Sequence, residues 1–422
     1  MTLHASPAVP STHSVDPLRW PDVAAVPRSS WMRTAVTERL LRRALGELPL
    51  RVRLPSGEQW GRGGPLMELH DPAAFHRRVG RFGLIGFGES YMAGEWDTPD
   101  PVGLLSVFAE HADRLLPPAL QRLRHLWAPR KPAAERNTVA GSRAHISHHY
   151  DLSNELFALF LDETLSYSAG LFRSLPADQE ALAPAQRRKV DHMLDLADVG
   201  PGTRLLEIGT GWGELALRAA RRGAEVVSVT LSREQLDVAR RRVEEAGLSD
   251  LVSVQLRDYR QVRGSFDAVV SVEMIEAVGA EHWPVYLGAL DRLLVPGGRA
   301  ALQAITMAHQ RMLATRNTWT WIHKYIFPGG LIPSREALTR IAHEETALCL
   351  ARYDRRGPHY AETLRLWRER FAEHTAEVSA LGFDAVFRRM WDLYLAYSEA
   401  GFRTGYLDVQ QLLFIKDGAT AP

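Results

Sequence analysis

Cysteine is nearly absent from this sequence, since Cys349 is the only one among 422 residues. A disulfide within the chain and a cysteine-rich metal site are therefore excluded. An excess of charge is also lacking, because 51 basic and 50 acidic residues leave a net charge of +1. This balance argues against a nucleic-acid-binding protein that depends on a globally basic surface.

Long hydrophobic runs are lacking as well. No apolar run approaches the roughly 20 residues that a membrane-spanning helix needs. Residues 1–30 are rich in Pro, Ser, Ala and Val, but they have no basic start followed by a hydrophobic stretch. We therefore expect a disordered tail rather than a secretion signal, and a cytoplasmic location.

Composition divides the rest of the chain into two predicted domains. Residues 31–127 combine a basic helical pattern with short strand-like runs, which predicts a small α+β domain. Residues 128–144 are polar and proline-bearing, as is typical of a linker. From residue 145 to residue 422, helical and strand patterns alternate. This alternation predicts an α/β fold with a doubly wound sheet and a ligand at the carboxyl ends of its strands.

One motif is central to the predicted second domain. The hydrophobic run 204–208 leads into a turn with glycines at 209, 211 and 213. The spacing differs from the Gly-x-Gly-x-x-Gly of dinucleotide-binding folds, and Glu207 would repel a pyrophosphate. A cationic cofactor without phosphate, such as S-adenosylmethionine (SAM), suits this acidic turn better. A glycine-rich turn without a ligand is the alternative interpretation.

Three further predicted strands end in polar segments. Thr230–Gln235 suits ribose or methionine contacts, Arg257–Arg260 suits an adenine ring, and Glu273–Glu276 is expected to face the reaction centre. Each segment also has a purely structural interpretation: a helix cap at Ser232, a turn at Asp258 and a solvated carboxylate at Glu273. Four suitable strand ends in this order favour a cofactor site.

The order of these segments resembles the Rossmann-like class I fold of SAM-dependent methyltransferases. More narrowly, it resembles the cyclopropane-fatty-acid synthase family, including actinobacterial members that make methylene-branched or methyl-branched, tuberculostearic-type fatty acids. The small N-terminal domain also resembles the lipid-facing domain of bacterial members. Beyond the glycine-rich turn, the matching motifs are His149–Asn154, Leu161–Ser168, Thr230–Gln235, Lys324–Gly330, Tyr360–Trp367 and Phe387–Leu395.

The resemblance implies a reaction. The cis double bond of an unsaturated phospholipid acyl chain attacks the SAM methyl group, and a base then removes a proton from the resulting carbocation. Ring closure gives a cyclopropane, whereas a preceding hydride shift gives a methylene branch, which a reductase partner could convert to a methyl branch. We expect the methylene product, with cyclopropane synthesis as the alternative and methylation of a small molecule as the second alternative.

The resemblance also assigns residues by position. Cofactor contacts fall on Tyr167, Ser168, Gly209, Gly211, Thr230, Leu231, Gln235, Asp258 and Tyr259. In the family, a bound bicarbonate accepts the proton. The positions that hold it read Ala169, Glu276, Gln303, Ile305 and Tyr360 in this sequence.

Two of these bicarbonate positions depart from the family pattern. Ala169 replaces a cysteine and Gln303 replaces a histidine, although an anion could still bind. Glu163 stands where typical cyclopropane synthases have proline. We hypothesise that the carboxylate of Glu163 or Glu276 replaces or assists the bicarbonate. A neighbouring sulfonium would keep such a carboxylate ionised. A helix or turn cap is the alternative role for Glu163.

Partners are predicted from the same patterns. Basic and apolar residues mix in the segments 39–53 and 120–127, which suits peripheral contact with an anionic membrane at its inner face. His145, His148 and His149 do not form a convincing metal-ligand set, so no metal is expected. The oligomeric state is left open, with a homodimer as one option.

Overall fold

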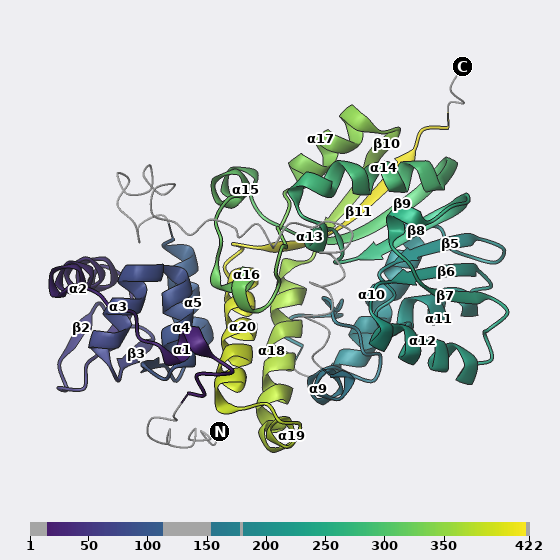
Figure 1. The fold of residues 1–422 in the computed structure, drawn as a ribbon. Helices are drawn as coiled ribbons and strands as arrows, with labels where there is room; N and C mark the ends of the chain where they lie inside the picture. The colour runs from purple at the N-terminus through teal and green to yellow at the C-terminus, as the bar shows by residue number, and fades with distance from the viewer. Residues whose placement is uncertain (1–14, 113–152, 178–179, 419–422) are drawn as a thin grey trace. The chain divides into compact units, whose positions relative to one another are not determined.

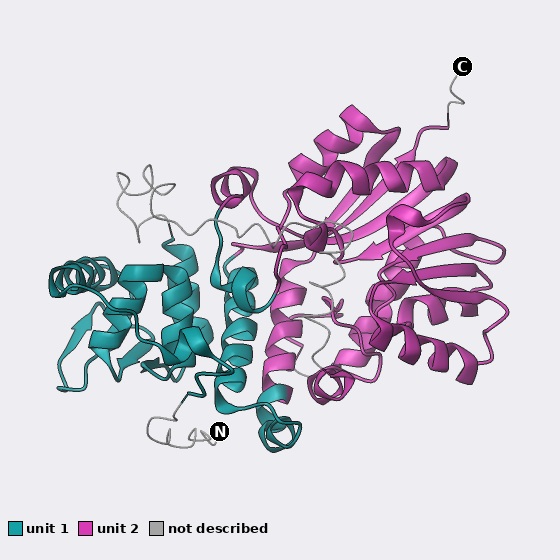
Figure 2. Cartoon of the chain, viewed as in Figure 1, with its two compact units in different colours: residues 1–131, 318–326, 371–404 teal, residues 132–317, 327–370, 405–422 magenta. Residues whose placement is uncertain are grey.

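The computed structural model describes residues 15–112, 153–177 and 180–418, and Figure 1 shows its helices and strands. The chain divides into two compact units, coloured separately in Figure 2. Unit 1 comprises residues 1–131, 318–326 and 371–404. Unit 2 comprises residues 132–317, 327–370 and 405–422.

Unit 2 is built on a seven-stranded sheet with the order β10-β11-β9-β8-β5-β6-β7. The five strands from β9 to β7 run parallel, whereas β11 is antiparallel to both of its neighbours. The strands are β5 (Arg204–Ile208), β6 (Glu225–Thr230), β7 (Val252–Leu256), β8 (Phe266–Val272), β9 (Leu294–Thr306), β10 (Leu348–Arg355) and β11 (Asp408–Lys416). The chain order reverses between β5 and β8, which creates the switch point where doubly wound folds bind their ligands.

Hydrophobic side chains cover both faces of this sheet, as the run of apolar residues in β5 and β8 requires. Leu205 and Val270 point into one core, and Leu206 and Val269 point into the other. Helices α10, α11 and α12 contribute to the first core, and α14 and α17 contribute to the second (Figure 1). The helices of unit 2 are α9 (Asn154–Phe160), α10 (Leu182–Leu196), α11 (Glu214–Arg221), α12 (Arg233–Glu245), α13 (Ile275–Val278), α14 (Trp283–Leu293), α15 (His309–Thr315), α17 (Arg335–Glu345) and most of α18 (Gly357–Glu373).

Unit 1 contains a small mixed sheet with the order β2-β1-β3-β4 and several helices. The strands are β1 (Arg51–Arg53), β2 (Gln59–Gly61), β3 (Leu66–Leu69) and β4 (Trp96–Asp97). The helices are α1 (Pro21–Ala24), α2 (Trp31–Gly46), α3 (Pro72–Phe82), α4 (Leu84–Met92), α5 (Pro101–Glu110), α16 (Trp321–Tyr325), α19 (Thr375–Ala380) and α20 (Ala385–Arg403).

Two distant segments complete unit 1, a division that differs from the predicted boundaries at residues 127 and 145. Helix α20 packs against α4 and α5, and α16 packs against α4. The Tyr91 hydroxyl donates to Asp392 Oδ2 at 3.0 Å. The Trp321 ring nitrogen donates to the Met92 sulfur at 3.3 Å.

Part of the predicted disordered tail is ordered. Residues 21–24 form α1, and the buried guanidinium of Arg78 donates to the backbone carbonyls of Asp22, Val23 and Ala25. The Trp20 ring nitrogen also donates to Asp384 Oδ2 at 2.8 Å. The expectation of disorder is therefore wrong for residues 15–30. The predicted linker at 128–144 and the basic segment 120–127 lie outside the described residues.

Within the part of the chain that the structure describes, no helix is both long enough and apolar enough to span a membrane. The glycine-studded stretch at 82–91 forms most of α4, where its glycines allow close packing. A Cβ atom on Gly88 would lie 2.3 Å from the ring of Trp321, and one on Gly86 would lie 2.2 Å from the Arg78 carbonyl. These glycines therefore fix how α16 and α3 approach α4.

Substitution Gly88→Ala tests the packing of α16 on α4. The added methyl group would overlap the buried Trp321 ring, and overpacking of this kind costs about 1–3 kcal/mol. We expect the midpoint of denaturant unfolding to fall accordingly. Gly46→Ala is the matched control, because it adds the same methyl group at a helical glycine with no atom within 4 Å. Equal stability of the two variants would contradict this account.

Candidate active site

The predicted cofactor residues of unit 2 follow the carboxyl ends of neighbouring parallel strands. Strand β5 ends at Ile208, β6 at Thr230, β7 at Leu256 and β8 at Val272. Since these strands are parallel, their carboxyl ends meet at one edge of the sheet. This edge includes the β5/β8 switch point, so the structure brings the segments together as predicted.

The glycine-rich turn has three residues in the left-handed region, with φ of 98° at Gly209, 53° at Gly211 and 93° at Gly213. A Cβ atom on Gly213 would lie 3.1 Å from Ala239 of α12, so this glycine allows close helix packing. A Cβ atom on Gly211 would meet nothing within 4 Å. Bare backbone at Gly211 therefore faces open space, as a turn that binds a cofactor requires.

Glu207, the penultimate residue of β5, is buried. Its carboxylate accepts a hydrogen bond from the Ser228 hydroxyl at 2.6 Å. Burial raises the pKa of Glu207 to about 8, because the charged form loses its hydration, and the charge of Lys189 opposes that rise. A cationic ligand beside this carboxyl would favour its charged form.

The segment after β6 combines a helix cap with side chains available to a ligand. Ser232 accepts from the backbone nitrogen of Gln235 at 3.2 Å and caps α12. The Thr230 hydroxyl donates to Gln235 Oε1 at 2.9 Å. This bond leaves the Gln235 amide group as a donor. The capping role of Ser232 and a cofactor role for Thr230 and Gln235 are thus compatible.

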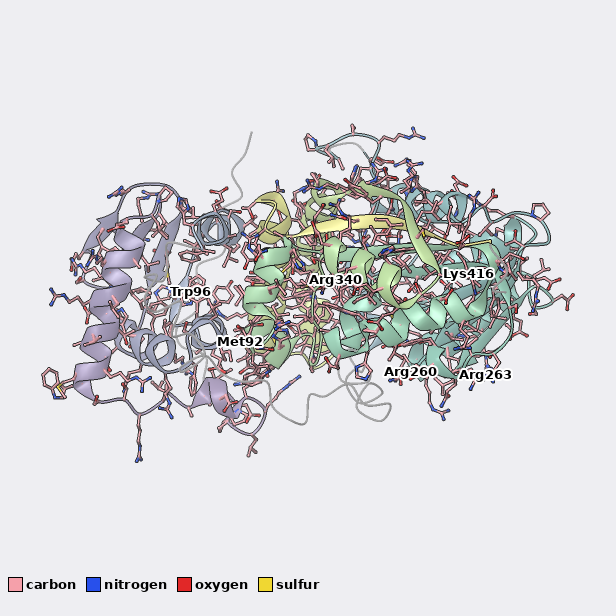
Figure 3. The ribbon with its side chains drawn as sticks, turned by 90° about the horizontal axis from the view of Figure 1, so that it is seen from above. Met92, Trp96, Arg260, Arg263, Arg340 and Lys416 are labelled. Atoms are coloured by element: carbon pink, nitrogen blue, oxygen red, sulfur yellow. The ribbon has the colours of Figure 1, made fainter. Side chains whose placement is uncertain are left out.

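The segment after β7 has a partner that the sequence analysis did not assign. Arg260 donates to both carboxylate oxygens of the buried Asp258, at 2.8 and 2.6 Å. Tyr259 packs edge-to-face on Tyr286 with ring centroids 5.1 Å apart and belongs to a hydrophobic core. Arg260 and Arg263 project together at one edge of unit 2 (Figure 3). Binding of adenine by Asp258 and Tyr259 stays a prediction.

Tyr167 and Ser168 lie on the loop between α9 and α10. The Tyr167 ring stacks on Trp367 of α18 with centroids 5.2 Å apart. Ser168 accepts a hydrogen bond of 2.6 Å from the Lys189 ammonium group, which is buried on α10. Burial lowers the pKa of Lys189 to about 8, although the charge of Glu273 opposes that change.

The carboxylate of Glu273 accepts hydrogen bonds from three predicted site residues. Its Oε1 accepts from the Ala169 backbone nitrogen at 3.0 Å and from the Gln303 amide at 2.8 Å. Its Oε2 accepts from the Tyr360 hydroxyl at 2.7 Å. Glu273 is therefore not the solvated carboxylate of the structural interpretation.

Glu276 lies in α13, three residues after Glu273, which precedes this helix. Its Oε1 accepts from the backbone nitrogen of Ile305, and its buried Oε2 has no hydrogen-bond partner among the described residues. Burial raises the pKa of Glu276 to about 8, and the neighbouring charge of Glu273 adds to this rise. Two adjacent carboxyl groups with different partners can divide the roles of acid and base.

Glu163 does not join this group. Its side chain is 67% exposed and pairs with Arg187 of α10 at 2.5 Å. This arrangement contradicts the hypothesis that Glu163 stands beside the predicted anion site. It favours a surface ion pair, which stabilises a fold little.

The five predicted bicarbonate positions do converge, but their donors are already used. Ala169, Gln303 and Tyr360 bind the Glu273 carboxylate, and the Ile305 nitrogen binds Glu276. A carboxylate and a bicarbonate offer the same oxygen acceptors, so both cannot occupy one donor set. The residues present therefore do not fit a bicarbonate in this arrangement.

The sequence analysis missed two supporting residues. The Gln411 amide on β11 donates to Gln303 Oε1 at 2.9 Å, which directs the Gln303 amide donors toward Glu273. Lys189 brings a positive charge to the same region. The adjacent glutamines at 410 and 411 within an otherwise apolar strand are a signal for the first residue. Lys189 has no comparable signal, because lysines on helices are usually solvated.

His145, His148 and His149, which were considered as metal ligands, lie outside the described residues. Within the described ranges, no group of three or more His, Cys, Asp or Glu side chains has an arrangement that could hold a metal ion.

Comparisons with known proteins agree with this architecture. Residues 138–412 match the family described as mycolic acid cyclopropane synthetase. The chain is 53% identical over 415 residues to tuberculostearic acid methyltransferase UfaA1 of Mycobacterium tuberculosis, covering 96% of this chain and 97% of that protein. It is 33% identical over 350 residues to cyclopropane-fatty-acyl-phospholipid synthase of Escherichia coli, covering 81% of this chain and 85% of that protein.

A solved structure is similar as well. Mycolic acid cyclopropane synthase CmaA1, complexed with SAH and CTAB, superposes with a TM-score of 0.60 at 31% sequence identity. The match covers 68% of this chain and 99% of that one.

Substitution Gly211→Val tests whether this turn binds SAM. The bulky side chain would enter the open space beside the turn, so we expect SAM affinity, measured by calorimetry, to fall about a hundredfold or more. Gly247→Val is the matched control, since Gly247 also has a positive φ, of 68°, and no atom within 4 Å. Both variants experience similar backbone strain, of roughly 1–2 kcal/mol. Equal loss of SAM binding in both would place the cofactor elsewhere.

Proposed function

Since the chain belongs to the mycolic acid cyclopropane synthetase family, we propose that it methylates the cis double bond of an unsaturated phospholipid acyl chain with SAM, giving a methylene-branched product. The observation that supports this proposal most is the 53% identity, over nearly the whole chain, to a tuberculostearic acid methyltransferase. The family and the methyltransferase fold agree with the prediction from the sequence.

The residues of unit 2 suit the demands of this chemistry. SAM, when bound, supplies a methyl group that forms a new carbon–carbon bond with the π electrons of the alkene. An alkene is a weak nucleophile, so the protein contributes mainly orientation and stabilisation of the lipid carbocation. The aromatic rings of Tyr167, Tyr360 and Trp367 lie together, and such rings stabilise a cation by about 0.5–2 kcal/mol.

Two alternatives to this function are considered. The first is a different lipid product formed after the same methyl transfer, and the second is methylation of a different acceptor. Proton loss without a hydride shift gives a cyclopropane, as in the reaction that names the Escherichia coli relative. Methylation of a small molecule is the second alternative, because a fold does not determine the acceptor. A methylene product would be the substrate of a partner reductase that forms the methyl branch. Bicarbonate is not part of this proposal, because the donors predicted to hold it bind Glu273 and Glu276.

A lipid substrate requires contact with a membrane surface, and α2 in unit 1 suits this role. Its apolar side chains Trp31, Met32 and Val36 are 78, 60 and 58% exposed. The same helix exposes Arg33, Arg39, Arg42 and Arg43. An exposed apolar stripe beside arginines favours the interface of an anionic bilayer. We therefore propose that α2 makes the peripheral contact with the membrane. The predicted segment 39–53 overlaps only the second half of this helix.

The proposed activity predicts a change in cellular fatty acids. In a host that makes neither cyclopropane nor branched fatty acids, expression with added oleic acid should convert a share of the acyl chains to products heavier by one CH2 group. Mass spectrometry detects this gain, and derivatisation distinguishes a methylene branch from a ring. Gly211→Val is the inactive control. A cyclopropane would favour the first alternative, and no product from a SAM-binding enzyme would favour the small-molecule acceptor.

The membrane contact predicts a second result. The double variant Trp31→Ser and Val36→Ser removes two exposed apolar side chains from α2, and each contributes on the order of 1 kcal/mol or more when buried in lipid. We expect binding to vesicles with anionic lipid, measured by co-sedimentation, to weaken about tenfold or more. Leu18→Ser is the control, because Leu18 is 93% exposed but lies outside α2. Unchanged binding of the double variant would assign the contact to another surface.

A further inference from the structure

We propose that Glu273 is the proton acceptor of the reaction, its own carboxylate taking the position that an external bicarbonate would otherwise occupy. This inference rests on the proposed function and names a catalytic residue for it. Glu273 is neither of the carboxylates, at positions 163 and 276, that the sequence suggested for this role.

The hydrogen bonds to Glu273 define an anion site that the chain fills by itself. Three donors from separate elements converge on one carboxylate: the Ala169 backbone, the Gln303 amide and the Tyr360 hydroxyl. Gln411 orients the Gln303 amide, so the donor set has its own support. Carboxylate oxygens accept two or more hydrogen bonds, and Oε2 therefore keeps acceptor capacity beside its bond to Tyr360.

The backbone at Glu273 is arranged for this placement. Its φ of 53° lies in the left-handed region, where non-glycine residues are disfavoured. Such strained positions concentrate at functional sites, where the surrounding structure holds them. Here the Glu273 backbone nitrogen donates to the Gln303 carbonyl at 2.7 Å. Residues 273 and 303 are therefore joined by one hydrogen bond between their main chains and one between their side chains.

The adjacent Glu276 determines which carboxyl is the base. Two close carboxyl groups cannot both ionise easily, and the proton stays on the one with fewer donors. Glu273 has three donors and the positive charge of Lys189 nearby, whereas Glu276 has two backbone donors, at Ile305 and at its own residue, and an Oε2 without a partner among the described residues. Burial raises the pKa of both carboxyls, but the three hydrogen bonds and the charge of Lys189 oppose this rise at Glu273, whereas the charge of Glu273 adds to it at Glu276. A proton shared by the pair is therefore expected on Glu276.

The proton step balances without a further reagent. After methyl transfer and the hydride shift, the cationic carbon of the lipid bears the new methyl group. A C–H bond of that methyl group breaks, its electron pair forms the exocyclic double bond, and the proton passes to Glu273. The carboxylate becomes a neutral carboxylic acid, and the lipid becomes neutral as well.

The first test measures anion binding and does not depend on lipid methylation. Carbon-13-labelled bicarbonate is titrated into the complex with S-adenosylhomocysteine and followed by nuclear magnetic resonance. We expect no binding to the wild type, and binding to Glu273→Gly, because glycine accepts the same φ and vacates the donor set. Binding by the wild type with an affinity equal to that of Glu273→Gly would overturn the proposal.

The second test measures turnover on unsaturated phospholipid vesicles. Removal of a general base typically costs a factor of 10² to 10⁴, so we expect Glu273→Gln to lower kcat about a thousandfold while SAM affinity is retained. Added bicarbonate should restore part of the activity of Glu273→Gly, but not that of Glu273→Gln, whose amide still fills the site. Glu225→Gln, at the exposed amino end of β6, is the control with unchanged turnover.

The two tests separate failure of this inference from failure of the proposed function. A wild type that excludes bicarbonate but methylates no acyl chain would refute the lipid substrate while retaining the self-filled anion site. Full turnover by Glu273→Gln would refute the role of Glu273 while retaining the lipid substrate. A thousandfold loss in Glu163→Gln instead would assign the base to the exposed glutamate and likewise refute this inference.

Discussion

Parallel strand pairing is the constraint on which the active site depends. The five strands β7, β6, β5, β8 and β9 run in one direction, so the residues that follow them meet at one edge of the sheet. The antiparallel strand β11 then adds Gln411 beside Gln303. Segments separated by more than a hundred residues thereby supply one hydrogen-bonded group, and no local motif could do so alone.

Much of unit 2 could be predicted because its signals are local. Strands β5 and β8 are largely apolar, although β5 contains Glu207 and β8 contains Asp267 and Ser271, and such largely apolar runs are typical of buried parallel strands. The order of the polar segments that follow these strands then predicted the edge of the sheet at which the cofactor binds. Strands β10 and β11 were not predicted, since their pairing depends on contacts distant in sequence. The edge strand β10 is also largely exposed and lacks a clear apolar pattern.

The catalytic group shows a sharper limit of prediction. Residue types at positions 169, 276, 303, 305 and 360 indicated an anion site, but not which anion enters it. That outcome depends on a positive φ at Glu273, which directs the side chain back toward β9. The error over Glu163 has the same origin. Its place in a motif suggested proximity, whereas its side chain points to solvent and Arg187.

Unit 1 is assembled from segments that are distant in the sequence, and this has a consequence for its synthesis on the ribosome. Its amino-terminal segment leaves the exit tunnel long before α16 and α20, which cover α4 and α5. Apolar surfaces of α4 and α5 must therefore wait uncovered while the whole sheet of unit 2, except β11, is made. An excised fragment ending before residue 321 would accordingly lack the two helices that pack on α4 and α5, and would expose apolar surface that the whole chain covers.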